Sequence, residues 1–520
     1  MAKTANIFTN LLNRFKKPII KEQEFETHKK RNYAGAMRSA KHADWFATGA
    51  STDSIINQDL VILRNRSRSL IRDNDYARNI KRLIQNNVIG QGVATQCTIK
   101  KANENLNDKL NSEIENIWLD WCKSDNCDVA GKLHFHDMER LIIGSLMENG
   151  EAIIRIVKQP VGKENIPLAL ELIEPDRLVN QNIAVSPINS NNQVRMGVEV
   201  NQFGRPQYYH FYAQHPQDYL FKKAPLKLIT IPASEIIHLY LHERIGQTRG
   251  VPWLHSTINR LRHLGEYENA EVVSARASAS LMGFIESEGR ITSGLAENEE
   301  NGEEVLEFSS GQIAKLNIGE KFTGFNPARP NTGAESFIRY MLRGMCSGVG
   351  VSYESASRDY SQSNYSSSRL ALLDDRDQYK VLQSWYIRGF RQKLHEHFLD
   401  AIVLSNKINI SNYFSNKKEY LSVSFKPRGW SWVDPTKEVQ AATQAVKSGF
   451  MTISDVISQT SGGQDPQDVF KNHASEREEL QKLDLDFDTL HYEGQNNQEK
   501  QEKKQNQNKQ SDENNQSNNE

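Results

Sequence analysis

Four residues of the types that bind zinc lie close together in the sequence: Cys122, Cys127, His134 and His136. Zinc prefers thiolate and imidazole ligands, and closed structural sites combine them at characteristic spacings. The C-x4-C spacing followed by an H-x-H pair fits no usual closed zinc site. We therefore predict ordinary core cysteines and surface histidines here, and no metal.

Three glycines, Gly344, Gly348 and Gly350, form a second candidate site. Backbone N–H groups near a helix terminus attract anions, so such a segment could cradle a phosphate. Glycine is also required where a turn needs a positive φ or where two helices approach closely. We favour the second interpretation, and we predict no cofactor.

Carboxylates could hold the catalytic metal of a nuclease, and the candidates are Glu148, Glu151, Asp374 and Asp375. Nothing in their spacing singles them out. The adjacent Asp374 and Asp375 would point to different faces of a helix. We expect all four on the solvated surface.

The chain contains no G-x-x-x-x-G-K-[ST], H-E-x-x-H, G-x-S-x-G or EF-hand sequence. This argues against a packaging ATPase or a common hydrolase. With 520 residues, 38% hydrophobic and 25% charged, the composition is that of a soluble globular protein of several domains. Its 64 Lys and Arg balance 65 Asp and Glu, so any handling of DNA depends on local geometry and not on a global basic field.

The cysteines and the apolar runs bear on the compartment. Four scattered cysteines indicate no disulfide framework, which favours a reducing compartment such as the cytoplasm during assembly. Residues 7–20 mix apolar and basic residues without an uninterrupted apolar core, and no apolar run reaches the ~18 residues that a membrane span needs. We expect neither secretion nor membrane insertion.

The N-terminal third is predicted to begin with two helices over 54–90. Asp53 is a candidate cap for the first, Asn74 or Asp75 for the second, and Gly90 and Gly92 end the pair. Their polar face is basic, which indicates either a solvated surface or contact with an acidic partner or a neighbouring subunit; it holds Arg64, Arg66, Arg68, Arg72, Arg78, Lys81 and Arg82.

Between about 95 and 245 the pattern is mixed α/β. A helix containing Trp118 and Trp121 precedes three predicted strands at 153–157, 168–173 and 236–241. Turn signals occur at 174–176 and 203–206.

From 251 to 285 the spacing predicts one helix beginning near Pro252, and thirty helical residues would span about 45 Å. A polar, acidic segment over 286–333 follows, with a strand candidate at 312–316, and then a second helix over 335–346.

A Ser- and Tyr-rich loop over 353–366 leads to a long amphipathic helix over 367–405, with Ser366 or Ser367 as its cap. Its apolar side is predicted to hold Leu370, Leu373, Leu382, Trp385, Leu394, Phe398 and Ile402.

The C-terminal part is predicted to hold three further helices and a tail. Asp434-Pro435 begins the first, Thr452 with Asp455 begins the second and Pro466 begins the third. Residues 495–520 contain 15 Gln or Asn among 26 and no hydrophobic residue, so we expect this tail to be disordered and dispensable.

Several segments, in this order and spacing, resemble the lambda-type phage portal proteins. They are Gly246-Gln-Thr-Arg-Gly-Val-Pro252, the segment from Tyr267 to Arg276, Gly348-Val-Gly-Val-Ser-Tyr-Glu354, Arg358-Asp-Tyr-Ser361, Asn364-Tyr-Ser-Ser367 with Arg369, and Lys437-Glu438 leading to Gly449. The similarity runs from about residue 30 to residue 480.

The resemblance implies a mostly helical α+β fold and an elongated subunit that assembles into a closed ring, typically of about twelve copies, around an axial channel. Its regions would be an N-terminal arm (1–29), the wing (30–250), a stem helix (251–285), the clip (286–333), a second stem helix (334–347), a tunnel loop (348–366), a long helix and wing return (367–430), a helical crown (431–490) and a disordered tail (491–520).

The resemblance also implies a function without catalysis: a channel at the head vertex for genome packaging, head–tail joining and DNA ejection. Implied partners are double-stranded DNA in transit, terminase, a capsid or scaffold protein and a head–tail adaptor. A channel for any sequence cannot hold DNA by tight base readout. We expect transient contacts from the loop residues Tyr353, Arg358, Tyr360, Asn364 and Tyr365. The alternatives are a DNA-processing nuclease and another connector or minor capsid protein.

Overall fold

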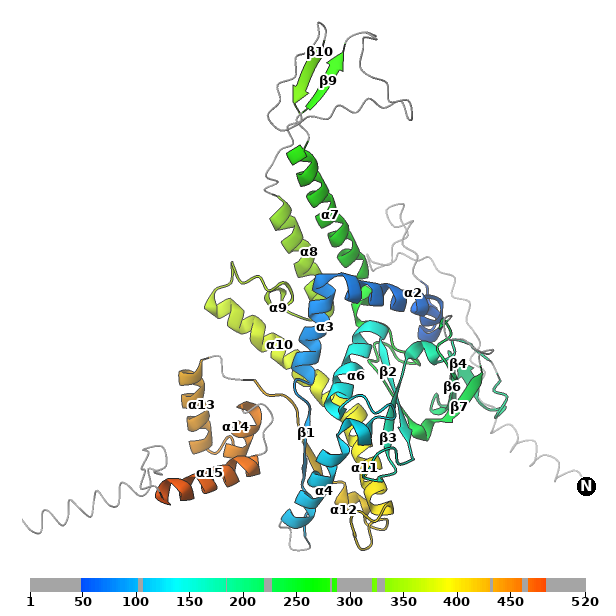
Figure 1. The fold of residues 1–520 in the computed structure, drawn as a ribbon, viewed down its shortest axis with the longest axis vertical. Helices are drawn as coiled ribbons and strands as arrows, with labels where there is room; N and C mark the ends of the chain where they lie inside the picture. The colour runs from blue at the N-terminus through cyan, green and yellow to red at the C-terminus, as the bar shows by residue number, and fades with distance from the viewer. Residues whose placement is uncertain are drawn as a thin grey trace, which may run out of the picture. The chain divides into compact units, whose positions relative to one another are not determined.

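A computed structural model describes residues 48–101, 106–183, 185–218, 227–280, 283–287, 320–324, 333–430, 434–460 and 466–482. The chain divides into two units, Met1–Ser51 and Thr52–Glu520, and almost all described residues belong to the second. Its described residues are mostly helical and form four small antiparallel sheets (Figure 1), so the predicted α+β class is confirmed. In the part of the chain that is described, no helix is long and apolar enough to cross a membrane.

The two predicted N-terminal helices are present as α2 (Thr52–Asp73) and α3 (Asp75–Val88). Asn74 caps α3, accepting a hydrogen bond from Ala77 N, as expected. Asp53 does not cap α2, because it is the second residue of that helix and its carboxylate accepts hydrogen bonds from Thr248.

The main core lies between a three-stranded sheet and the helices around it. The sheet has the order β3-β2-β8, formed by β2 (Glu151–Val157), β3 (Ala169–Ile173) and β8 (Ile236–Tyr240), so the three predicted strands are confirmed. Figure 1 shows α6 (Phe135–Asn149) beside this sheet, and α3 packs against α6. Helix α4 (Asp108–Trp121) adds Trp118 and Trp121, whose rings pack against Phe135 and Phe398.

A second sheet is an antiparallel meander, and a small apolar core joins it to the first sheet. Its strands are β4 (Gln193–Arg195), β5 (Val198–Val200), β6 (Pro206–Tyr212) and β7 (Leu228–Pro232). Gly204, at the expected turn between β5 and β6, has a φ of 78°. In a third sheet, β1 (Ala94–Cys97) pairs with β11 (Val423–Lys426), which joins segments far apart in the sequence.

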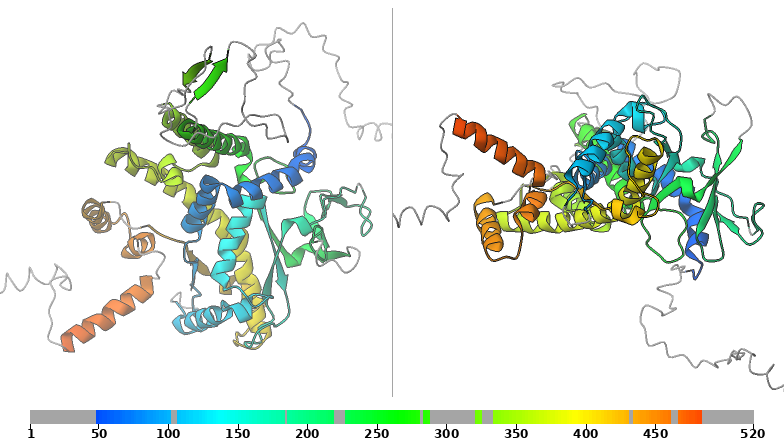
Figure 2. Two further views of the ribbon diagram at one scale, coloured as in Figure 1. Left: turned by 45° about the horizontal axis from the view of Figure 1, so that its top comes forward. Right: turned by 90° about the horizontal axis from the view of Figure 1, so that it is seen from below.

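Two helices of the central region, α7 (Ile258–Ser280) and α8 (Ala334–Val349), lie side by side (Figures 1 and 2). Beyond their ends, β9 (Gly283–Ser287) pairs with β10 (Glu320–Gly324). Helix α7 is shorter than the expected 251–285 helix, because a separate 3-10 turn (Trp253–Ser256) follows Pro252 and strand β9 follows Ser280. Its 23 residues span about 35 Å. The strand candidate at 312–316 lies outside the described residues.

The predicted long helix is continuous but contains a π-helical turn. It consists of α10 (Tyr365–Tyr386), the π turn Ile387–Arg391 and α11 (Gln392–Leu404). Leu394, Phe398 and Ile402 are fully buried, as expected. Leu370 and Leu373 are exposed, contrary to prediction, because the described residues leave these two side chains largely uncovered, at 71% and 41% exposure.

The three C-terminal helices are present as α13 (Pro435–Lys447), α14 (Ile453–Thr460) and α15 (Pro466–Lys482). Asp434 caps α13, and Thr452 and Asp455 form the expected reciprocal cap of α14. The tail at 495–520 lies outside the described residues. The remaining short helices are the 3-10 turns Pro175–Arg177 and Ala233–Glu235 and the single-turn helices α5 (Ser124–Cys127), α9 (Tyr353–Ser357) and α12 (Lys417–Tyr420).

Candidate functional site

The segment that connects α8 to α10 begins with the three glycines. Gly350 ends α8 with a φ of 80°, and its N–H donates to Cys346 O at 2.8 Å. A Cβ atom on Gly348 would lie 2.7 Å from Cγ2 of Thr257, and one on Gly344 would overlap Arg260. The glycines therefore serve a turn and close helix packing, as favoured above, and the phosphate-cradle alternative has no support.

The next residues form the short helix α9, which is fastened to α10 by one carboxylate. Asp375 is 4% exposed and accepts hydrogen bonds from Ser352 N (2.8 Å), Ser352 Oγ (2.6 Å) and Ser355 Oγ (3.1 Å). Burial raises the pKa of Asp375, and the serine hydrogen bonds oppose this shift. The prediction that Asp375 lies on the solvated surface was wrong.

On its other side, α9 is held by α3. Asn79 Nδ2 donates to Ala356 O at 2.8 Å and to Ser355 O at 3.2 Å, and Ala356 is buried. Asn79 Oδ1 accepts from Arg358 Nε at 3.4 Å. The predicted loop over 353–366 is therefore a docked helical turn followed by a shorter connection over 358–364, which we call the 358–364 loop.

Tyr353 packs within the subunit. Its hydroxyl donates to Asp359 Oδ2 at 2.7 Å, and the guanidinium of Arg343 lies 5.5 Å from its ring centre. Hydrogen bonds from Ser361 and Tyr353 lower the pKa of Asp359 to about 2, so this carboxylate is ionised at any physiological pH. Asp359 thereby ties the 358–364 loop to the first residue of α9.

The other predicted loop residues divide into an exposed group and a cap. Arg358, Tyr360 and Tyr365 are exposed, with Tyr360 at 60% and Tyr365 at 58%, and Arg358 adopts a φ of 58°. Asn364 is the N-cap of α10, accepting from Ser367 N at 2.8 Å, whereas Ser366 or Ser367 had been expected to cap it. Asn364 is exposed as well, so four of the five predicted side chains are exposed, and one of these four serves as the cap.

A second constellation, centred on Glu151 of β2, was not anticipated. Glu151 is fully buried and accepts from Arg249 Nη2 (2.6 Å), His238 Nε2 (3.0 Å) and the Gly250 N–H (3.0 Å), and it also pairs with Arg64. Burial alone would raise the pKa of Glu151, but the charges of Arg249 and Arg64 place this pKa well below the ordinary value. The ionised carboxylate is balanced by the charges of the two arginines, and its oxygens are occupied and not available to a metal.

The contacts in and around this cluster account for the residue types in the segment Gly246-Gln-Thr-Arg-Gly-Val-Pro252. Gln247 Oε1 accepts from Glu243 N at 2.9 Å, its Nε2 donates to Arg249 O at 2.8 Å, and Thr248 binds Asp53. A Cβ atom on Gly250 would lie 2.1 Å from Gly150 O. The segment thus fixes the chain that enters α7 against β2 and α2.

Arg64 shows why the basic face of the first two helices was misinterpreted. It is 3% exposed, and it donates to Asn149 O as well as pairing with Glu151. Arg68 pairs with Asp176, and Lys81 with Glu148. Part of the basic run therefore meets acidic groups of its own chain, which neither predicted alternative described. The available signal was the presence of acidic residues elsewhere in the sequence that could pair with this basic face, such as Glu148, Glu151 and Asp176.

The zinc-like residues have other partners. Cys127 Sγ hydrogen-bonds Cys122 O at 3.3 Å, and burial raises the pKa of Cys127 to about 12. His134 caps α6, and His136 Nδ1 lies 2.9 Å from Glu139 Oε2. The cysteines are core residues as predicted, whereas the histidines are half-buried rather than on the surface.

With this geometry established, comparisons place the chain among known proteins. A family model described as phage portal protein, lambda family, matches residues 38–383. The chain belongs to this family. The chain is similar to a probable portal protein of Halomonas phage phiHAP-1, which is 28% identical over 464 residues, covering 88% of each chain. Portal protein B of Escherichia phage lambda is 23% identical over 491 residues, covering 85% of this chain and 87% of that one.

Solved structures also resemble the chain at a low level. A chain in the neck of an empty gene transfer agent particle has a TM-score of 0.45 and 14% identity, covering 75% of this chain and 92% of that chain. A likeness at this level says nothing about function. The function as a phage portal protein follows from the family match and from the relatives, and the location is the phage particle.

Proposed function

We propose that copies of this chain form a closed ring of about twelve subunits, the number typical of portals, whose axial channel carries double-stranded DNA at the head vertex.

 The observation that carries the proposal is family membership across residues 38–383. A cyclic ring uses two different surfaces of each subunit, and an exposed apolar stripe such as Leu370 and Leu373 on α10 suits such a contact. Proposed partners are terminase, a capsid or scaffold protein and a head–tail adaptor, with assembly in the host cytoplasm.

The proposed regions follow the family's architecture with boundaries adjusted to the observed elements. The wing comprises the elements from α2 to β8, together with α10, α11 and β11. The stem comprises α7 and α8, the clip includes β9 and β10, and the crown comprises α13 to α15. The 358–364 loop is the proposed tunnel loop.

We infer that the 358–364 loop faces the channel and acts on the movement or retention of DNA. Asp375 holds the helix α9 that precedes the loop, and Asn364 caps the helix that follows it, while Arg358, Tyr360 and Tyr365 are exposed. A guanidinium and phenol hydroxyls can bind phosphate oxygens without reading bases. A few exposed contacts of this kind suit a channel in which DNA must slide.

The role is proposed to be non-enzymatic. Glu151 is paired with arginines, Asp375 with serines and Glu148 with Lys81, so these candidate carboxylates are separated and occupied. ATP hydrolysis or metal-dependent DNA cleavage by the purified protein would contradict this part of the proposal.

The ring is tested by negative-stain microscopy of the purified full chain. We expect rings with a central hole, and uniform monomers at all concentrations would contradict the proposal.

The loop is tested by replacing Arg358 with alanine and Tyr360 and Tyr365 with serine in one variant. We expect normal rings with reduced packaged DNA per head or leakage of packaged genomes. The matched control removes an aromatic ring and a guanidinium from the exposed turn at Phe203 and Arg205, which we expect to leave packaging unchanged. Normal packaging and retention in the loop variant would contradict the channel role.

A further inference from the structure

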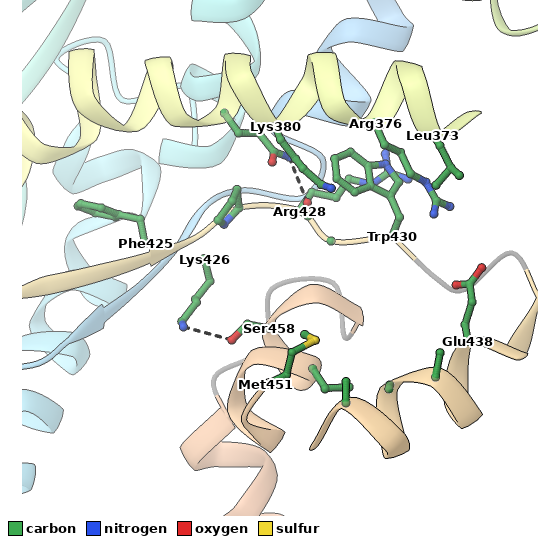
Figure 3. Close-up of a pocket in the computed structure, with 17 residues that line it drawn as sticks. Leu373, Arg376, Lys380, Phe425, Lys426, Arg428, Trp430, Glu438, Met451 and Ser458 are labelled. Atoms are coloured by element: carbon green, nitrogen blue, oxygen red, sulfur yellow. Dashed lines mark hydrogen bonds between the residues drawn. The ribbon is translucent and has the colours of Figure 1, made fainter. Parts of the chain in front are cut away.

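A groove separates α10 from the C-terminal helices. It has a volume of about 790 Å³ and lies between α10, the segment after β11, and helices α13 and α14 (Figure 3). Its apolar lining includes Leu373 of α10, Phe425 of β11, Trp430 after that strand, Ala441 and Ala445 of α13, Met451, and Val456 of α14. Helix α13 buries no residue within its own chain. The groove is therefore an apolar surface with room for a further segment.

The groove carries more basic than acidic side chains. Among the described residues that line it, Arg376, Lys380, Lys426 and Arg428 are basic, and Glu438 is acidic. Burial lowers the pKa of both Arg376 and Arg428, which indicates that these cations are partly removed from water. An anionic occupant would compensate such cations. Apolar walls with basic side chains fit an acidic, apolar peptide better than they fit a DNA backbone.

The chain itself contains a segment of this character directly after α15. Residues 483–490 read Leu-Asp-Leu-Asp-Phe-Asp-Thr-Leu, in which apolar side chains alternate with three aspartates. In an extended segment this period of two places the aspartates on one face and the leucines and phenylalanine on the other. One face would meet the cations of the groove, and the other its apolar wall.

The reach of this segment favours a second copy of the chain over the same copy. Helix α15 starts next to α14, leads away from the groove (Figures 1 and 2) and has 17 residues, so it spans about 25 Å. Eight extended residues cover at most about 28 Å. A segment returning to its own groove would use almost its whole length to arrive, leaving few residues to occupy the groove.

We propose that residues 483–490 of one subunit dock in the groove between α10 and α13–α14 of a second copy. The proposal rests on the ring described above, in which a neighbouring copy is always present. It assigns to this segment the joining of adjacent subunits near their C-terminal helices.

The test is a cross-link between two differently marked full-length chains. One chain carries Lys426→Cys and the other carries Asp486→Cys; they are mixed during assembly and treated with a short bis-maleimide. The native cysteines are buried, and burial raises the pKa of each thiol, so they should react slowly. We expect a cross-linked dimer. The matched control replaces Asp486→Cys with Ser511→Cys, farther along the same tail, and should give at least about fivefold less dimer, as expected for a local contact.

Competition and charge-reversal experiments test whether the contact depends on the aspartates of the segment and the basic side chains of the groove. An excess of a peptide with the sequence of residues 483–494 should suppress the cross-link, whereas the same peptide with the three aspartates replaced by asparagine should suppress it at least about tenfold less effectively. Lys380→Glu in the chain that carries Lys426→Cys should lower the yield, while Lys132→Glu, on an exposed turn, should not. Suppression by duplex DNA but not by the peptide would overturn the proposal and make the groove a DNA contact.

Ring formation is measured separately from the cross-link, so failure of the docking contact can be distinguished from failure of the ring. Rings by microscopy with no cross-link above the Ser511→Cys level would overturn this inference and leave the proposed ring intact. A peptide-sensitive cross-link in a sample without rings would support the docking contact and contradict the ring.

Discussion

Asp375 of α10 accepts two hydrogen bonds from Ser352, one from its N–H at 2.8 Å and one from its hydroxyl at 2.6 Å. Ser352 directly precedes α9, and Asp375 lies within α10, the helix that follows the 358–364 loop. Because the carboxylate is 4% exposed, these bonds are shielded from competition by water. The pair fixes where the exposed loop begins relative to the helix that follows it.

Replacing Asp375 with alanine should therefore destabilise the subunit by about 1–3 kcal/mol, since partly buried donors on Ser352 and Ser355 lose their acceptor. Urea denaturation of the full chain measures this. The adjacent Asp374→Ala is the control: Asp374 is exposed, and its loss should change the free energy of unfolding by less than about 0.5 kcal/mol. Limited proteolysis should also cut Asp375→Ala faster within 358–364. Equal stability of the two variants would contradict the anchoring role.

The Glu151 cluster should be the costliest ionic contact to break. Glu151→Gln leaves the buried charge of Arg249 without this counter-ion and leaves Arg64 with Asp176 alone, so we expect a loss of about 3–5 kcal/mol. The same substitution at Glu148, which pairs with Lys81 nearer the surface, should cost at most about 1 kcal/mol. Chemical denaturation distinguishes them, and a Glu151→Gln variant as stable as Glu148→Gln would show that the cluster contributes little.

The same cluster predicts a loss of stability in acid. Burial lowers the pKa of His238, so folding favours its neutral form and stability falls as the pH drops below the unfolded value of about 6.5. The pKa of Glu151 is depressed by Arg249 and Arg64, so its contribution is present above about pH 5 and is lost at lower pH. The urea midpoint should therefore fall between pH 7 and pH 5. His395 contributes to this decline, because burial lowers its pKa to about 4. The midpoint should fall further below pH 5, where the contribution of Glu151 is lost. His238→Gln should flatten the first decline. A midpoint that stays constant from pH 7 to pH 4 would refute this.

The helices and central strands could be predicted because their signals are local. Capping residues such as Asn74, Asp434 and Thr452 and the apolar periodicity mark helix ends and buried faces within a few residues. The end of α7 could not be predicted, since the helical pattern continues past Ser280 while β9 pairs with β10, more than thirty residues away.

The candidate site was predicted only in part, for the same reason. The composition of 353–366 indicated an exposed loop, and Tyr360 and Tyr365 are exposed. The docking of α9 depends on Asn79 and Asp375, which approach it from two other helices. The burial of Arg64 against Glu151 likewise joins residues 87 positions apart, and a charge pattern along one helix cannot reveal a partner on a distant strand.

The glycines of the chain allow two substitutions with opposite expected effects. In Gly250→Ala the new Cβ would lie 2.1 Å from Gly150 O and 2.7 Å from Cβ of Tyr240, so backbone must shift where Gly250 N also binds Glu151. We expect a loss of about 3 kcal/mol or more. Gly265 lies within α7, where the nearest neighbour of a new Cβ is 3.9 Å away, so Gly265→Ala should add about 0.5–1 kcal/mol through helix propensity. Thermal denaturation of both variants at equal protein concentration gives the comparison. A Gly250→Ala protein that melts with or above the parent would mean that β2 and the segment entering α7 are not packed as closely as described, while a destabilised Gly265→Ala would indicate a contact of α7 with a neighbouring subunit.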